Sequence, residues 1–179
     1  MKRSIEVSKC THFFVANTKS SWLWLIIRVY LGWEFLIAGW EKFTSPAWIG
    51  SSVGTGISGF VQGALAKTGG LHPDVQMWYA SFLQTAVSAH PVVWSYAITY
   101  GEMAVGLGLI FGCLTGVAAF FGIFMNLNFM LAGSISTNPI LALLGIGILL
   151  ARRVSGHIGL DYWVRPRMEK CCRSKAGGQ

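Results

Sequence analysis

Residues 21–40 read SWLWLIIRVYLGWEFLIAGW, a run in which only Arg28 and Glu34 are charged. A helix needs roughly 20 mostly apolar residues to cross the hydrocarbon of a membrane, and this run has that length. A basic start followed by an apolar run also occurs in signal peptides, but the two charges interrupt the run and no small-residue cleavage site follows it. We therefore expect a first transmembrane helix here that is retained in the mature protein.

The composition of the whole chain favours the same class. Of the 179 residues, 53% are hydrophobic and 12% are charged, whereas soluble domains carry about 25% charged residues. A water-soluble fold of this size would have too few charges to cover its core. Three further apolar segments, 92–111, 115–131 and 139–151, therefore complete the prediction of an all-α integral membrane protein with a four-helix bundle, its last helix short for a full crossing.

The basic residues predict the orientation and the division of the chain. Lys and Arg concentrate on the cytoplasmic side of membrane proteins, and here they gather in 1–20 and 152–179, which we expect to be cytoplasmic tails flanking a membrane domain at 21–151. The loop 41–91 has only two basic residues, Lys42 and Lys67, and is expected on the outer side of the membrane. Positive charge next to a membrane is typical of binding to anionic lipid headgroups. Nucleic-acid binding would need this charge on a folded basic face, which the sequence does not indicate. Membrane lipid, and not nucleic acid, is the expected partner.

Two stretches of the outer loop show the period of a helix face. Apolar residues recur at intervals of three and four in both stretches: Ile57, Phe60, Val61, Ala64 and Leu65 in the first, and Met77, Trp78, Phe82 and Leu83 in the second. They predict two short amphipathic helices on the outer membrane surface, with Trp48, Trp78, Tyr79 and Trp94 at headgroup level. A lid that only plugs the bundle fits this loop at least as well as a role in substrate binding. Residues 156–163 are expected to form a matching anchor on the inner surface.

Three ionisable residues fall deep in the predicted membrane segments. Arg28, Glu34 and Glu102 are costly there, so each is expected to have a partner or a function. A rise of about 1.5 Å per residue places Glu34 and Glu102 near the midplane, level with Asn126 and Asn128 of the third segment. The sequence therefore predicts a polar belt near the middle of the membrane.

Helix geometry limits which polar side chains of this belt can pair with one another. Arg28 and Glu34 point about 120° apart, so Arg28 is expected to pair with Glu102 of the neighbouring helix. Glu34 is then left with an Asn or with a proton, while Asn126 and Asn128, two residues apart, cannot both face one seam. The belt has two interpretations: a buried ion pair that fixes helix register, or a polar pocket and proton path for a redox-active lipid such as a quinone.

The sequence lacks the residues that disulfide exchange, haem binding and metal binding require. The chain has no C-x-x-C pair among its four cysteines, which membrane disulfide oxidoreductases require. The four histidines lie in tails or loops, without the spacing of a haem or metal site. We expect no metal and no covalently bound cofactor on this chain. The glycines of the first two segments predict close helix packing.

A series of motifs resembles the DoxX/DoxD family. It runs in order through RVYLGWEFLIAGWEKF at 28–43, Gly101-Glu102, GLGL at 106–109, GCLT at 112–115, NLNF at 126–129, STNP at 136–139 and Gly159-Leu160-Asp161. The resemblance implies a multi-pass, four-helix protein in the cell membrane of a prokaryote. It also implies work beside a thiosulfate:quinone oxidoreductase, in which a DoxD-type subunit and a DoxA-type subunit oxidise thiosulfate to tetrathionate and reduce quinone.

The expected function is that of a quinone-interacting membrane subunit of an oxidoreductase, partnered by a DoxA-like or other redox subunit. Glu34 is the expected proton relay, and Arg28 and Glu102 are expected to form the charge pair of the active pocket. Asn126 or Asn128 would donate to a quinone oxygen, with Lys42 at the outer end. Two alternatives remain: a membrane scaffold that docks a soluble redox partner, and a small transporter, against which the lack of an inverted repeat argues.

Overall fold

The computed structural model describes residues 9–164 and Pro166. Predictions that rest on residues 1–8, Arg165 and 167–179, including much of the basic charge of both tails and the adjacent Cys171 and Cys172, lie outside this range. All regular structure among the described residues is helical. The predicted all-α class is thus confirmed for this part of the chain.

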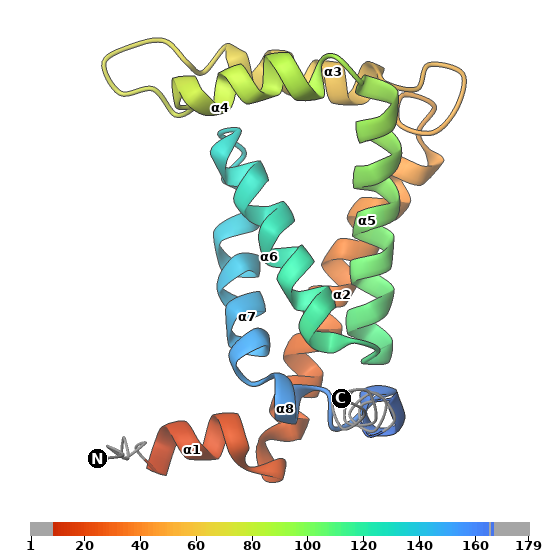
Figure 1. Cartoon of the computed structure of the whole chain (residues 1–179), viewed down its shortest axis with the longest axis vertical. Helices are drawn as coiled ribbons and strands as arrows, with labels where there is room; N and C mark the ends of the chain where they lie inside the picture. The colour runs from red at the N-terminus through yellow and green to blue at the C-terminus, as the bar shows by residue number, and fades with distance from the viewer. Residues whose placement is uncertain (1–8, 165, 167–179) are drawn as a thin grey trace, which may run out of the picture.

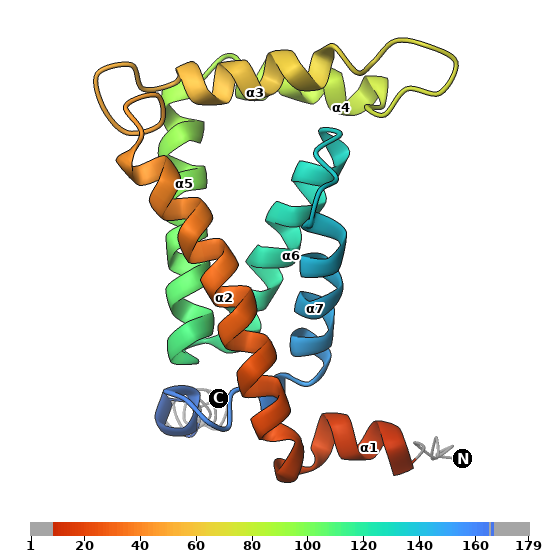
Figure 2. The same cartoon turned by 180° about the vertical axis from the view of Figure 1, so that it is seen from behind.

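Four helices form the body of the molecule: α2 (Ser21–Thr44), α5 (Pro91–Phe111), α6 (Thr115–Leu131) and α7 (Asn138–Leu150). The predicted segments match α5, α6 and α7 closely, and α2 continues one turn beyond the predicted end of the first segment. Antiparallel packing joins α2 to α5 and α6 to α7 (Figures 1 and 2). The body is therefore built from two helix pairs.

The two pairs meet at one end and diverge toward the other. A short turn, residues 112–114, joins α5 to α6, and the two helices separate with distance from it (Figure 1). Across the wide end lie α3 (Thr55–Leu65), α4 (Met77–Phe82) and the π-helical turn η2 (Leu83–Val87), together called the roof. Residues 155–161 run beneath the narrow end and are called the floor.

Short helices lie near the floor. They are α1 (Lys9–Ala16), η1 (Thr18–Ser20) and α8 (Arg152–Ser155). The predicted amino-terminal tail thus contains a helix that the hydropathy of the sequence does not indicate. The two ends of the described chain lie on this same side of the molecule (Figure 2).

The roof has its own apolar core, and this confirms the two amphipathic helices predicted for the loop. The core consists of Ile57, Val61, Ala64, Val75, Tyr79, Ala80, Leu83, Val87 and Ala132. Trp78 is exposed, as a surface anchor requires, but Tyr79 is only 4% exposed. The predicted headgroup position of Tyr79 is therefore wrong, because its ring faces inward, four residues from Val75 and from Leu83 on one helix face.

Glycines bring α2 and α5 into close contact. A Cβ atom on Gly32 would lie 2.9 Å from the Gly106 carbonyl oxygen, and one on Gly106 would lie 2.8 Å from the Gly32 carbonyl oxygen. Any side chain at either position would push the two backbones apart. The predicted close packing of these glycines is confirmed, and it makes the α2–α5 pair a tight unit.

One helical stretch among the described residues, Thr18–Thr44, is long and apolar enough to cross a membrane by length and composition. α6 and α7 are apolar but shorter, with 17 and 13 residues. The structure thus identifies one clear candidate span, and the crossing of the other three helices stays a prediction.

Candidate functional site

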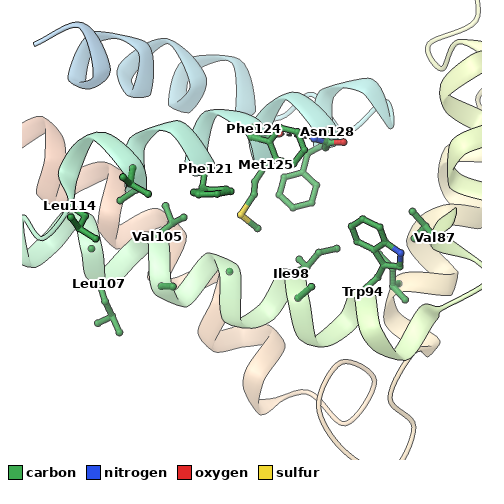
Figure 3. A pocket seen from close by; sticks show the side chains of 18 of the residues that line it. Val87, Trp94, Ile98, Val105, Leu107, Leu114, Phe121, Phe124, Met125 and Asn128 are labelled. Atoms are coloured by element: carbon green, nitrogen blue, oxygen red, sulfur yellow. Dashed lines mark hydrogen bonds between the residues drawn. The ribbon is translucent and has the colours of Figure 1, made fainter. Parts of the chain in front are cut away.

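An apolar pocket of about 800 Å³ lies between α5 and α6, beneath the roof. Side chains such as Val105, Phe121 and Met125 form its walls (Figure 3). Phe111 and Phe124, also in the walls, are more than half exposed at 58% and 55%, so the pocket opens sideways between the two helices. Pockets for small molecules are mostly apolar and measure roughly 300–1,000 Å³, and this one has the size for such a ligand.

The hydrogen-bonding groups of the pocket lie at its roof end. The Tyr79 hydroxyl donates to Asn128, with its oxygen 3.0 Å from the Asn128 carbonyl oxygen and 3.1 Å from Oδ1. Asn128 Nδ2 donates one hydrogen to the Phe124 carbonyl at 2.8 Å. The indole N–H of Trp94 is already used by the Ala86 carbonyl, at 3.0 Å.

This arrangement leaves two groups for a ligand. An amide nitrogen has two hydrogens, and a hydroxyl oxygen accepts as well as donates. Among the described residues, the second N–H of Asn128 has no acceptor, and the Tyr79 oxygen keeps its lone pairs. Burial raises the pKa of Tyr79 to about 12, so the hydroxyl keeps its proton at neutral pH.

The floor lies at the opposite end of the pocket. Leu160 lines the pocket there, beside Cys113 and Leu114. The Leu160 N–H donates to the Phe111 carbonyl at 3.1 Å, and the Asp161 N–H donates to the Gly112 carbonyl at 2.7 Å. The floor is therefore hydrogen-bonded to the end of α5.

Asp161 also determines where α6 begins. Its two carboxylate oxygens accept the backbone N–H groups of Leu114 and Thr115 at 2.7 and 2.8 Å. The first N–H groups of a helix have no partner within it, and its positive end favours an anion. The carboxylate of the floor thus caps the helix that forms one wall of the pocket.

Arg28 holds the floor from the other side. This side chain, 1% exposed, donates from its two terminal nitrogens to the carbonyls of Ser155 and Ile158, at 3.0 and 2.7 Å. A Cβ at Gly112, whose φ is +65°, would overlap the guanidinium, so only glycine fits this turn. Arg28 thus fills the space between the α5–α6 turn and the floor.

Glu102 pairs with Lys42 near the roof. The Lys42 ammonium lies 2.7 Å from Oε2 and 3.0 Å from Oε1 of Glu102, whose side chain is 2% exposed. The same ammonium lies 6.0 Å from the ring centre of Phe129. Because Phe129 lines the pocket, the ion pair sits just behind the pocket wall.

The predicted pairing of Arg28 with Glu102 is therefore wrong. A Cβ at Gly39 would lie 3.2 Å from the Cβ of Glu102, so Glu102 is level with Gly39. That level is eleven residues, or about 16 Å, along α2 from Arg28. The error arises because the height of one helix against its neighbour does not follow from counting along each helix separately.

The prediction of one midplane cavity holding Arg28, Glu34 and Glu102 is also wrong, since none of the three lines the pocket. Glu34 is half-buried on α2, without a hydrogen-bond or ion-pair partner among the described residues. Asn126 is buried, and its Nδ2 lacks a partner there too. Of the predicted site residues, Asn128 alone lines the pocket, and the prediction that the two Asn residues face different sides is confirmed.

The roles of two residues were not predicted from the sequence: Tyr79 at the roof end of the pocket and Asp161 at the start of α6. Tyr79 belongs to an apolar series with Val75, Leu83 and Val87 at intervals of four, and that spacing indicates a buried face. Asp161 follows two glycines in the segment expected to be a surface anchor. Nothing in its local sequence indicates that its carboxylate caps a helix that begins 46 residues earlier.

Comparison with known proteins identifies the family. No curated protein and no solved structure matches the chain. The DoxX family model matches residues 23–134, which is more than half of the chain and includes α2 from its third residue on, the roof, α5 and α6. This chain therefore belongs to the DoxX family of membrane proteins.

Proposed function

We propose that this chain is a quinone-interacting membrane subunit of an oxidoreductase, and that the quinone occupies the pocket between α5 and α6. The pocket itself carries the proposal: it has apolar walls, a side opening and hydrogen-bonding groups at one end. A quinone combines a ring bearing carbonyl acceptors with an apolar chain and is dissolved in the membrane. A side opening would let it enter without passing through water.

In this proposal α2, α5, α6 and α7 cross the membrane as one domain, residues 21–151. The roof faces the outside, and both tails face the cytoplasm of a prokaryotic cell. The bias of Lys and Arg toward the tails supports this orientation. The exposed apolar surface of α6 and α7, which includes Phe120, Phe121, Leu143 and Leu150, supports contact with lipid.

The reaction that we propose takes electrons from a donor on another subunit. Reduction of a quinone consumes two electrons and two protons and gives the quinol. If the donor is thiosulfate, as the resemblance to DoxD-type subunits suggests, two thiosulfate ions release two electrons and join into one tetrathionate ion. Glu34 remains the candidate proton carrier of the membrane domain, although it lies outside the pocket lining.

Binding of quinone is the first test. The protein in lipid nanodiscs should bind a ubiquinone or menaquinone analogue, and Gly101→Leu should abolish the binding. Gly101 lines the pocket, and a Cβ there makes only ordinary contacts with Met125, so a larger side chain would fill the space without disturbing the fold. The matched control is Gly63→Leu on α3, where a Cβ meets nothing within 4 Å. Equal binding by both variants would contradict the pocket assignment.

A docking scaffold without its own chemistry is the second candidate. The observation that favours it is the structural use of Arg28 and Glu102, which hold the floor and the α2–α5 seam. Thiosulfate-dependent quinone reduction, measured with and without a DoxA-like partner, separates the two. Activity that needs the partner but tolerates Gly101→Leu and Glu34→Gln would support the scaffold.

A further inference from the structure

We propose that the pocket takes a lipid with one neutral polar ring and one apolar chain, with the ring at the roof end beside Tyr79 and Asn128 and the chain directed to the floor. This inference rests on the proposed function, because it concerns the same pocket. It adds the direction in which the ligand lies and the kind of lipid that fits.

The polarity of the lining sets the direction. Tyr79 and Asn128 lie at the roof end, where Asn128 is labelled in Figure 3. The walls below them and the floor end are apolar apart from the thiol of Cys113. A polar group placed at the floor end would lose its water without gaining a strong hydrogen bond. That loss costs free energy, so a one-headed ligand is more stable with its head under the roof.

The free hydrogen-bonding groups match both redox states of such a ring. A ring carbonyl needs a donor, which the second N–H of Asn128 supplies. A ring hydroxyl also needs an acceptor, which the Tyr79 oxygen supplies. Both residues come from elements fixed by other contacts, since Tyr79 lies in the roof core and Asn128 is bonded to Phe124.

The length of the pocket calls for a chain. Its α6 wall runs from Val117 to Phe129, which is about 18 Å at 1.5 Å per residue. A single ring would fill only part of that length. The remaining part is lined by aliphatic and aromatic side chains, which suit an extended hydrocarbon.

The charges of the lining exclude the commonest membrane lipids. None of the described residues that line the pocket is charged. Lys42, whose ammonium lies near Phe129 behind the pocket wall, is held by Glu102. A phospholipid carries a phosphate that would have no counter-ion in the pocket, and burying an unpaired charge is strongly unfavourable. The site therefore favours a neutral head.

Photocrosslinking tests the direction. Two quinone analogues with a ten-carbon chain are needed, one with an azide on the ring and one with a diazirine at the chain end. Each is added to the full-length protein in nanodiscs, and the labelled peptides are identified by mass spectrometry. The ring probe should label residues 79–87 and 124–129, and the chain-end probe should label residues 111–118 and Leu160.

The outcomes separate this inference from the proposed function. The reverse pattern, or identical labelling by both probes inside the pocket, would overturn the direction while leaving a quinone site in place. Labelling that is not reduced by excess unlabelled quinone, or that falls outside the pocket, would overturn both. With the probe held at a constant mole fraction of the lipid, labelling that a ringless acyl-chain analogue reduces as strongly as unlabelled quinone does would show that an ordinary acyl chain occupies the groove, and would overturn the inference.

Variants at the roof end provide an independent measurement. Tyr79→Phe and Asn128→Leu should each weaken quinone binding about three- to tenfold, the usual effect of one hydrogen bond. Neither should change the binding of a chain-only probe that lacks the ring. The matched control is Tyr96→Phe, an exposed tyrosine of α5 outside the pocket. Equal losses for both probes would mean that the variants act through the fold, and unchanged binding of the ring would overturn the proposal.

Discussion

The ammonium of Lys42 and the carboxylate of Glu102 meet in the seam between α2 and α5, where water has little access. Arg28 instead turns to backbone carbonyls of the floor. Both cations therefore connect parts of the chain that are far apart in sequence. At the scale of single residues, the deep charges of this protein contribute to its fold before any role in chemistry is considered.

The ion pair should be strongly coupled. Glu102→Gln or Lys42→Met alone leaves the partner charge poorly solvated, and we expect either change to lower the free energy of unfolding by about 3–5 kcal/mol. The double variant should lose less than the sum of the two. Unfolding in mixed detergent micelles measures all three, with Asp74→Asn, an exposed carboxylate in the loop before α4, as the control. Losses that simply add would show that the two charges act independently.

Tyr79 predicts a stability change at high pH. Burial raises its pKa to about 12, above the usual value of about 10. The folded state keeps the Tyr79 hydroxyl protonated to a higher pH than the unfolded state does. The contribution of this hydroxyl to the stability of the fold is therefore complete below about pH 10 and is lost as the pH rises toward 12. The free energy of unfolding should fall in this window, and less steeply in Tyr79→Phe. Tyr96→Phe should keep the wild-type slope, and an unchanged slope in Tyr79→Phe would contradict the burial of this hydroxyl.

At the scale of helices, the α2–α5 pair is packed more closely than the α5–α6 pair. Glycines let the backbones of α2 and α5 touch. By contrast, α5 and α6 are joined by their turn and separate beyond it, with bulky side chains lining the space between them (Figure 3). One seam of α5 is therefore closed and the other is open, and the open seam contains the pocket.

The closed seam should not tolerate a methyl group. Gly32→Ala or Gly106→Ala places a Cβ within 2.9 Å of the opposing backbone. Overpacking of this kind costs about 1–3 kcal/mol, which thermal unfolding of the purified protein would detect. The control Gly63→Ala on the exposed face of α3 should be neutral or slightly stabilising, because Ala favours helix. Equal stability of the seam variants and the control would mean that the helices lie farther apart than described.

At the scale of the whole molecule, the floor joins the two helix pairs. Residues 155–161 are held by Arg28 of α2, by the end of α5 and, through Asp161, by the start of α6. A segment after the last long helix thus fixes the angle at the narrow end. The roof determines the other end through its own apolar core.

Release of the floor should expose the floor end of the pocket. Arg28→Met leaves the carbonyls of Ser155 and Ile158 without a donor, at a cost of about 1–3 kcal/mol for each. We expect faster maleimide labelling of Cys113, which lies beside Leu160 in the pocket. Peptide mass spectrometry reports this cysteine separately from the other three.

The second variant, Asp161→Asn, should accelerate the labelling of Cys113 less, since one oxygen still accepts an N–H. Glu41→Gln should leave the rate unchanged. Wild-type rates in both floor variants, measured below their unfolding temperatures, would show that the floor does not protect this end of the pocket.

The sequence predicts where the helices begin and end, but not how they are placed relative to one another. The bounds of α6 follow from an apolar run, and α3 follows from the spacing of Ile57, Val61 and Ala64, because both are properties of one segment. The partners of Arg28 are two backbone carbonyls 127 and 130 residues away, at the end of α8 and in the turn after it, and a backbone carbonyl gives no side-chain signal in the sequence. The pocket arises from the divergence of two helix pairs, and no single segment encodes that angle.

The sideways opening between α5 and α6 also determines how occupancy should be measured. A ligand that arrives through this opening partitions first into the surrounding lipid, so the bilayer acts as its solvent. Adding more lipid at fixed amounts of protein and ligand would then empty the site, whereas adding more buffer would not. Affinity for such a protein is properly expressed as a mole fraction of lipid and not as an aqueous concentration.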